Sequence, residues 1–168
     1  MRALVLALAA LLLVPAAAPA AKTRNIDVPK KFKALLVVAR DKTDVPILLP
    51  QKYRTDAKKL VPSGSFARKR YTFSLSAIQG CGGATACFIA DFSAKRGGKP
   101  HYQRKVTLTG GRTGYFKPLT CGASCSPPVI EWVENKVLYW IQAHAGNKRQ
   151  EKKRLVAMAN SAIEHGAR

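Results

Sequence analysis

The sequence predicts an α+β protein, in which a twisted antiparallel β-sheet of about six strands carries an N-terminal and a C-terminal helix on one face. Within residues 71–143, short segments of alternating apolar and polar side chains follow one another, which is the pattern of half-buried strands. Apolar residues with helical spacing lie on either side of this region, at 27–40 and 147–163. The sequence shows no internal repeat.

The first residues predict export from the cytoplasm. Arg2 is followed by an uncharged apolar run at 3–14 and by small residues at 18–20, so we expect a secretory signal peptide over residues 1–20 and a single domain over residues 21–168. The alternative is a membrane anchor, but the run is shorter than the roughly 20 residues that a spanning helix needs. We therefore expect a secreted or periplasmic protein with no transmembrane span after cleavage.

The N-terminal helix is predicted from its start signals and its apolar face. Asp27 can cap the helix, and Pro29 is tolerated in the first turn because its missing N–H has no partner inside the helix. The apolar face comprises Phe32, Leu35, Leu36 and Ala39. A strand remains the alternative, because the β-branched pair at 37–38 weakens the helical prediction.

Two segments then lead to the sheet. Residues 45–50 form an apolar run bounded by prolines, which indicates an edge strand or an extended segment on the core. Residues 51–70 are polar and basic, and we expect a surface connection with some strand character near residues 60–61.

The strands are expected in consecutive hairpins. Their predicted ranges are 71–75, 87–94, 105–109, 112–117, 129–133 and 137–143. Turns are indicated by a Gly-rich tip at 79–86, by Gly110-Gly111 and by 134–136, where Asn135 tolerates the left-handed conformation.

The chain is expected to end in a helix that starts after Asn147, with Gln150 as its capping-box partner. The predicted apolar face comprises Leu155, Met158, Ala159, Ala162 and Ile163. Five cations crowd its first turns, which is unfavourable beside the positive end of the helix dipole. Such a cluster suggests that the cations have a use, although Glu151 offsets part of the repulsion.

The four cysteines predict two disulfides, because an even count in an exported chain is typical of a disulfide framework. Three pairings are possible. We favour the local ones, Cys81–Cys87 and Cys121–Cys125, because each closes a short loop that contains glycine. Three residues separate Cys121 from Cys125, whereas a redox-active pair normally has two, and the spacings fit a zinc site poorly.

The charge favours anionic partners. The chain carries 29 Lys and Arg against 9 Asp and Glu, which gives a formal net charge of +20. Lipid head groups, a wall polymer or an acidic protein are the expected partners, and nucleic acid is less favoured because exported proteins seldom meet it. The candidate anion-binding residues are Lys148, Arg149, Lys152, Lys153, Arg154, Arg68, Lys69 and Arg70. The oligomeric state is not predicted.

Several segments carry a resemblance: VPILLP, YTFSLS, ACFIADFSA, CGASCSPP and LVAMANSAI. In this order they resemble a group of uncharacterised secreted bacterial proteins over nearly the whole exported part. More loosely, the chain is similar to a domain of unknown function found in bacterial envelope lipoproteins. The resemblance implies an α+β sheet domain in the cell envelope, and it carries no activity and no catalytic residues.

No arrangement of residues predicts a reaction. The three histidines do not stand at ligand spacing, Glu131 and Glu134 have a simpler explanation as surface charges, and residues 110–114 lack the context of a phosphate-binding loop. We therefore expect no metal or cofactor and no catalytic residues. The favoured function is a non-catalytic interaction module whose basic surface binds an anionic partner. The alternative is an envelope-acting enzyme or enzyme inhibitor whose site is assembled from distant residues.

Overall fold

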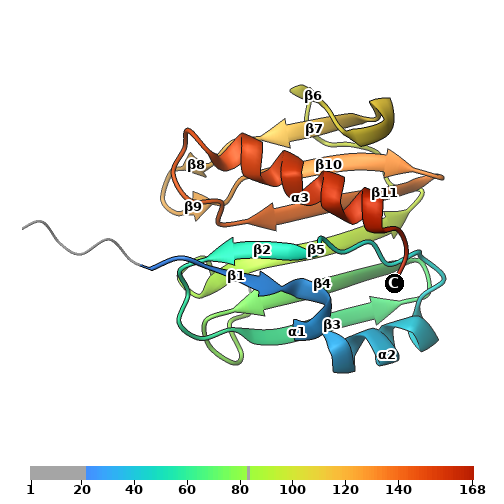
Figure 1. The fold of residues 1–168 in the computed structure, drawn as a ribbon, viewed down its shortest axis with the longest axis horizontal. Helices are drawn as coiled ribbons and strands as arrows, with labels where there is room; N and C mark the ends of the chain where they lie inside the picture. The colour runs from blue at the N-terminus through green and yellow to red at the C-terminus, as the bar shows by residue number, and fades with distance from the viewer. Residues whose placement is uncertain (1–21, 83) are drawn as a thin grey trace, which may run out of the picture.

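The computed structural model describes residues 22–82 and 84–168, so the predicted signal peptide lies outside the described residues. The predicted α+β class is confirmed: a large antiparallel sheet of seven strands carries the helices (Figure 1). From one edge to the other, its strands are β3 (Val61–Ala67), β4 (Arg70–Ser76), β5 (Phe88–Arg96), β11 (Val137–Ala143), β10 (Val129–Glu134), β7 (Thr113–Lys117) and β6 (Lys105–Thr107).

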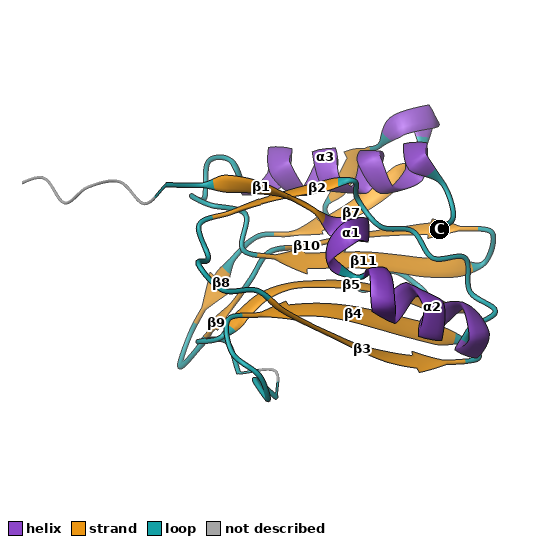
Figure 2. Ribbon diagram, turned by 60° about the horizontal axis from the view of Figure 1, so that its bottom comes forward, coloured by secondary structure: helices purple, strands orange, loops and turns teal. Residues whose placement is uncertain are grey.

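The remaining elements are shorter or lie outside this sheet. They are β1 (Arg24–Asp27), β2 (Lys52–Thr55), α1 (Val28–Lys31), α2 (Lys33–Lys42), the 3-10 turn η1 (Thr109–Gly111), β8 (Thr120–Cys121), β9 (Cys125–Ser126) and α3 (Glu151–His165). The strands β1 and β2 form an antiparallel ribbon of their own. Figure 2 shows this ribbon and the three α-helices on the same side of the seven-stranded sheet.

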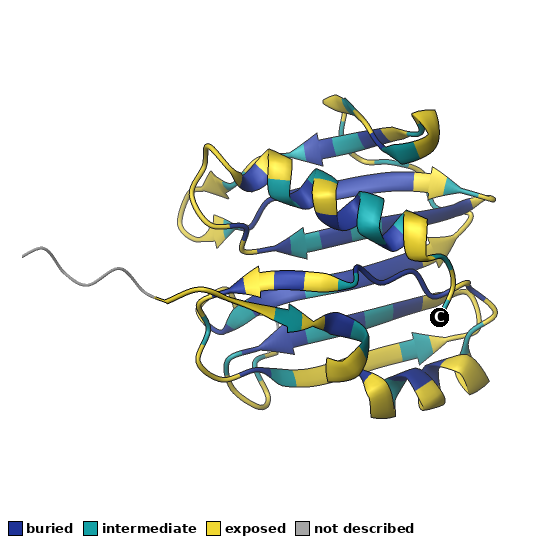
Figure 3. Cartoon of the chain, viewed as in Figure 1, coloured by how far each residue is buried: buried dark blue, intermediate teal, exposed yellow. Residues whose placement is uncertain are grey.

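The core lies between the sheet and this helical layer, and alternation along the strands determines what it contains (Figure 3). Phe32, at the junction of α1 and α2, packs on Phe73 and Phe92 at ring-centroid distances of 5.1 and 6.0 Å. Under α3, the rings of Trp132 and Tyr139 stack at 5.4 Å. Aromatic side chains therefore hold the helical layer on both halves of the sheet.

The N-terminal helix is confirmed, and its cap is the predicted one. The Asp27 side chain accepts a hydrogen bond from the backbone N–H of Lys30 at 2.9 Å, and Pro29 lies in the first turn. The helix is interrupted at Phe32, which separates α1 from α2. Residues 45–50 form no strand and cover the core as an extended segment, which was one of the two predicted alternatives.

The prediction of a surface connection over residues 51–70 is wrong, because this range contains β2 and β3, although the strand character expected near residues 60–61 coincides with the start of β3. In β2, Tyr53 and Thr55 are buried while Lys52 and Arg54 face outward. Because these exposed cations make the segment look polar, they obscure the two-residue period that is typical of a strand. The other strand, β3, forms an edge of the sheet, where most of its side chains remain exposed.

The C-terminal helix is confirmed, but it begins at Glu151 and not directly after Asn147. The side chain of Asn147 accepts a hydrogen bond from the N–H of Gln150 at 3.1 Å and thereby caps a turn that precedes the helix. The Gln150 side chain bonds to Arg154 at 2.6 Å instead of reaching back to Asn147. The predicted capping box is therefore not formed.

Both predicted disulfide pairings are confirmed. Cys81 bonds to Cys87 and closes the tip of the β4–β5 hairpin, and Cys121 bonds to Cys125 and joins β8 to β9. The turn between β10 and β11 also forms as expected, with positive φ angles of 50° and 62° at Asn135 and Lys136. None of the described helices is long and apolar enough to cross a membrane.

Candidate functional site

A groove of about 620 Å³ lies between the β1–β2 ribbon and α3. Its lining residues are Asn25, Gln51, Lys52, Tyr53, Arg54, Ala145, Arg154, Ala157, Met158, Ser161 and His165. Two segments about one hundred residues apart in the chain thus form its two walls. The volume lies in the usual range of about 300–1,000 Å³ for small-molecule sites.

The periods of the two elements determine which side chains line the groove. In β2, Lys52 and Arg54 point outward because they alternate with the buried Tyr53 and Thr55. On α3, the lining residues are 154, 157, 158, 161 and 165, which follow the three- and four-residue steps of a single helix face. A strand that presents cations therefore faces a helix stripe that contains both cations and apolar side chains.

Apolar side chains form the floor of the groove. Ala145, Ala157 and Met158 lie there beside the ring of Tyr53. The Tyr53 hydroxyl points into the protein, where it donates to the carbonyl oxygen of His144 at 2.8 Å. Burial raises the pKa of this hydroxyl far above its usual value, although a hydrogen bond with Thr55 opposes the shift. Tyr53 therefore stays neutral, and its ring, which is only 2% exposed, backs the groove and offers it almost no open surface.

The polar rim of the groove carries the cations Lys52, Arg54 and Arg154 together with the imidazole of His165, and none of the described residues that line it is a carboxylate. The Arg154 guanidinium is held by Gln150 and packs over Gly146, where a Cβ atom would collide with it. The Arg54 Nε donates to the hydroxyl of Thr23 at 2.8 Å. These contacts give the two guanidinium groups defined positions, which favours recognition of an anionic group.

The predicted anion-binding residues are divided between two distant places. Arg154 lines the groove, whereas Lys152 and Lys153 are exposed on α3 outside the groove lining, and Lys148 and Arg149 lie in the preceding turn. The other three, Arg68, Lys69 and Arg70, lie at the turn between β3 and β4. The β3–β4 turn lies beside Lys95, near the C-terminal end of β5. The helix α3 follows β11, whose last residue, Ala143, pairs with Ala90 near the opposite end of β5. The structure therefore does not bring the two groups together.

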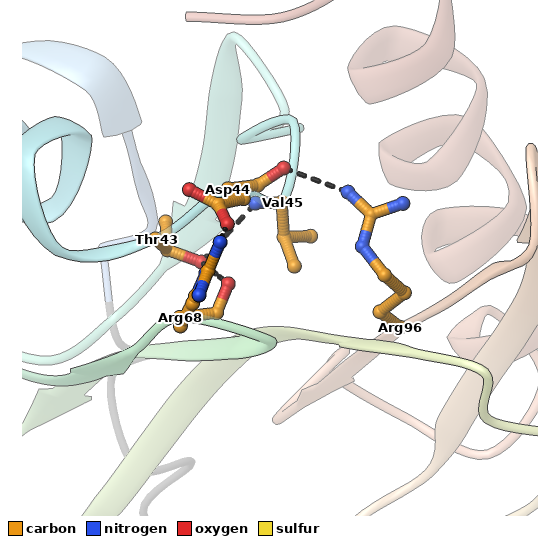
Figure 4. Close-up of polar contacts among 5 residues, drawn as sticks. All are labelled: Thr43, Asp44, Val45, Arg68 and Arg96. Carbon is orange, nitrogen blue, oxygen red and sulfur yellow. Dashed lines mark hydrogen bonds and ion pairs between the residues drawn. The ribbon is translucent and has the colours of Figure 1, made fainter.

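At the β3–β4 turn, Arg68 has a structural partner (Figure 4). Its Nε donates to the Asp44 carboxylate at 2.8 Å, and this hydrogen bond raises the pKa of Arg68. The Asp44 carbonyl oxygen accepts from the Nη2 of Arg96 at 2.8 Å, and the Thr43 hydroxyl bonds to the Arg68 carbonyl at 3.4 Å. Arg68 thus connects the 43–45 loop to the sheet, which weakens its case as an anion-binding residue.

Sequence reasoning missed three of the four basic residues of the groove: Lys52, Arg54 and His165. Lys52 and Arg54 lie in the range that was predicted to be a surface connection, so their alternation with Tyr53 was not used. His165 lies eleven residues after Arg154, which is three helical turns, and this spacing is the signal that could have linked them. Their position opposite β2 depends on tertiary packing that no local pattern shows.

A second polar arrangement involves His101 and Glu131. The His101 Nδ1 lies 2.8 Å from Oε1 of the nearly buried Glu131, and the His101 backbone N–H donates to Oε2 at 2.7 Å. Within the described ranges, no hydroxyl or thiol bonds to this imidazole, and no group of three or more potential metal ligands is found. The His101–Glu131 pair holds the 97–104 loop in place. Among the described residues, it has no bonded side chain that could act as a nucleophile.

Comparison of the chain with protein-family models, curated proteins and solved structures gives no match. An α+β fold by itself carries no function. The function is therefore inferred from the geometry and chemistry of the groove.

Proposed function

We propose that the chain is an exported envelope protein that acts as a non-catalytic interaction module, and that its groove between β2 and α3 binds an anionic lipid. The phosphate of the head group lies among Lys52, Arg54 and Arg154, and part of the lipid's apolar portion lies along the floor. The observation that carries the proposal is this cationic groove, whose described lining residues include apolar side chains and no carboxylate.

The charge of the groove supports an anionic ligand. Lysine and arginine side chains bind phosphate through charge-assisted hydrogen bonds, and the planar guanidinium can bind it with two donors. A small polar anion would leave the exposed side chain of Ala157 uncovered, whereas a lipid covers it together with the small accessible part of Met158. The combination of cations and apolar side chains favours an amphiphilic ligand. A wall polymer carries charge but has little apolar surface that could pack on the floor of the groove.

Export is supported independently of the groove. The described part of the chain contains two disulfides, which persist in oxidising compartments and are rare in the cytosol. The predicted signal peptide agrees with this location. A periplasmic or secreted protein with a basic groove encounters the anionic head groups of the envelope membranes.

The first test uses vesicles of phosphatidylglycerol mixed with phosphatidylcholine, and of phosphatidylcholine alone, in a co-sedimentation assay. The mature protein should bind only the anionic vesicles. Arg54→Gln removes one cation from the groove, and we expect it to weaken binding about fivefold, since a basic residue near an anionic surface contributes about 1 kcal/mol. Its matched control is Lys153→Gln, which removes the same charge from an exposed position outside the groove lining.

The control separates the groove from the overall charge, because both variants change the net charge equally. We expect Lys153→Gln to change the affinity by less than about twofold. Equal losses in the two variants would show that the net charge alone drives binding and would contradict a role for the groove. Failure of the wild type to bind anionic vesicles at low salt would exclude the lipid and would leave an acidic protein as the partner to test.

A further inference from the structure

None of the helices in the described part of the chain lies on the second face of the seven-stranded sheet (Figure 2). Strand registers place its side chains in rows across the strands. One row comprises Ser65, Thr72, Ser93, Trp140, Glu131 and Tyr115, and the next comprises Ser63, Ser74, Asp91, Gln142, Val129 and Lys117. We call this surface the open face. Most of its side chains carry hydroxyl, amide or carboxylate groups, and Trp140 lies half-buried near its centre.

A hollow of about 290 Å³ lies on one side of Trp140. Its lining residues are His101, Tyr102, Val129, Glu131, Trp140 and Gln142. The half-buried rings of Trp140 and Tyr102 thus border the same space, together with an amide and a carboxylate. Such a site combines aromatic surface with groups that bind hydroxyls.

The 97–104 loop forms one wall of this hollow and is fixed in two places. A Cβ atom at Gly98 would lie 2.8 Å from the Cβ of Leu138, so the loop packs directly on β11. Both oxygens of the Glu131 carboxylate bond to His101. This second contact fixes His101, which directly precedes Tyr102 in the chain. The hollow is therefore already formed in the free protein.

A second hollow, of about 310 Å³, adjoins Trp140 and extends toward β3 and β4. Ser65, Arg70, Thr72 and Lys95 contribute to its lining. Trp140 therefore separates two hollows on the same face, and the two together form a path across the sheet. A chain of repeating units fits such a path better than a single small molecule does.

We propose that the open face binds a neutral glycan chain, with one sugar ring in the hollow between Trp140 and Tyr102 and the neighbouring sugars in the second hollow, beside Ser65 and Thr72. The C–H face of a sugar ring packs on an aromatic ring, as other amphipathic surfaces do. Ser65 and Thr72 each have a hydroxyl that can donate and accept, which matches the hydroxyls of a sugar. The amide nitrogen of Gln142 donates to Ser126 and Pro127, so Gln142 contributes its amide oxygen as an acceptor. The site is on the opposite side of the sheet from the lipid groove and does not depend on it.

The charges of the open face disfavour the other polymers. Glu131 and Asp91 place carboxylates near its centre, although the chain has only 9 acidic residues against 29 basic ones. Lys117, Arg70 and Lys95 also lie on this face, so both signs of charge are present and the face lacks the continuous positive surface that nucleic acid or an anionic wall polymer needs. A protein partner requires a more apolar interface core, whereas Trp140 is the one large apolar side chain that both hollows share.

The proposal is tested with chitohexaose and cellohexaose, which present sugars with and without an acetamido group. Binding to the mature protein is measured by calorimetry and by tryptophan fluorescence, where Trp140 is the half-buried reporter and Trp132 is buried. We expect at least one of the oligosaccharides to bind and to shift the emission. The preferred one identifies the type of sugar.

Substitution of a ring then tests the hollow itself. Tyr102→Ala should weaken binding at least about tenfold, whereas Tyr115→Ala, which removes a half-buried tyrosine from the same face outside both hollows, should leave the affinity unchanged. Trp140→Ala should abolish binding, and its circular dichroism spectrum checks that it folds. Absence of binding to both oligosaccharides, or equal losses in the two tyrosine variants, would overturn the proposal.

Discussion

Asp91 illustrates how a single residue on the open face carries a cost in stability. It lies partly buried on β5, and this burial raises the pKa of its carboxyl group above the usual 3.8, although a hydrogen bond with Ser74 opposes the shift. The native state therefore binds a proton at a higher pH than the unfolded state does. At neutral pH the ionised carboxylate is destabilising relative to a neutral side chain of the same shape.

We expect Asp91→Asn to raise the free energy of unfolding at neutral pH. The gain should shrink as the pH falls through the raised pKa toward 3.8, because the wild-type carboxyl group then becomes neutral in the native state as well. Urea denaturation at neutral pH, and at the lowest pH at which the protein stays folded, measures this difference. Asp56→Asn, at an exposed position, is the control. A gain that is the same at both pH values would contradict the role of burial.

At the scale of elements, the sequence predicted what local patterns determine. Alternation identified β4 and β5, and turn signals between strand-forming runs identified the β6–β7 and β10–β11 hairpins. Asp27 marked the start of the N-terminal helix, and the short Cys loops indicated both disulfides. The strands β2 and β3 lack such a pattern, because outward-facing cations and an edge position remove the apolar signal. The groove and the open face could not be predicted, because they depend on which strands pair and on which side the helices pack.

The 97–104 loop gives a test at this scale. Gly98 does not need a left-handed backbone, so Gly98→Ala acts through the close contact of its new Cβ with Leu138. We expect a cost of about 1–3 kcal/mol in stability. The displaced loop should also weaken oligosaccharide binding, because it carries Tyr102. Thermal denaturation and calorimetry measure both effects, with the exposed Lys99→Ala as the control. Unchanged stability would contradict the close packing of this loop.

At the scale of the whole molecule, the sheet separates two surfaces of different chemistry. The helical side contains the cationic groove, and the open face contains aromatic, hydroxyl and carboxylate groups. The net charge of +20 attracts the protein to anionic surroundings, but it does not distinguish one cation from another. Selectivity has to come from the groove, where Arg54 and Arg154 have defined neighbours and an apolar floor lies between the walls.

The central claim is that the groove, and not the charge in general, binds an anionic lipid. Its most direct test is a titration of the ¹⁵N-labelled mature protein with dihexanoylphosphatidylglycerol below its micelle concentration, followed by amide chemical shifts. We predict saturable shifts at residues 51–54 and 154–165, which line the groove, and none at 68–70. Shifts of similar size at 68–70, or an absence of saturation, would contradict the claim, because they would show that the lipid follows the positive charge wherever it lies.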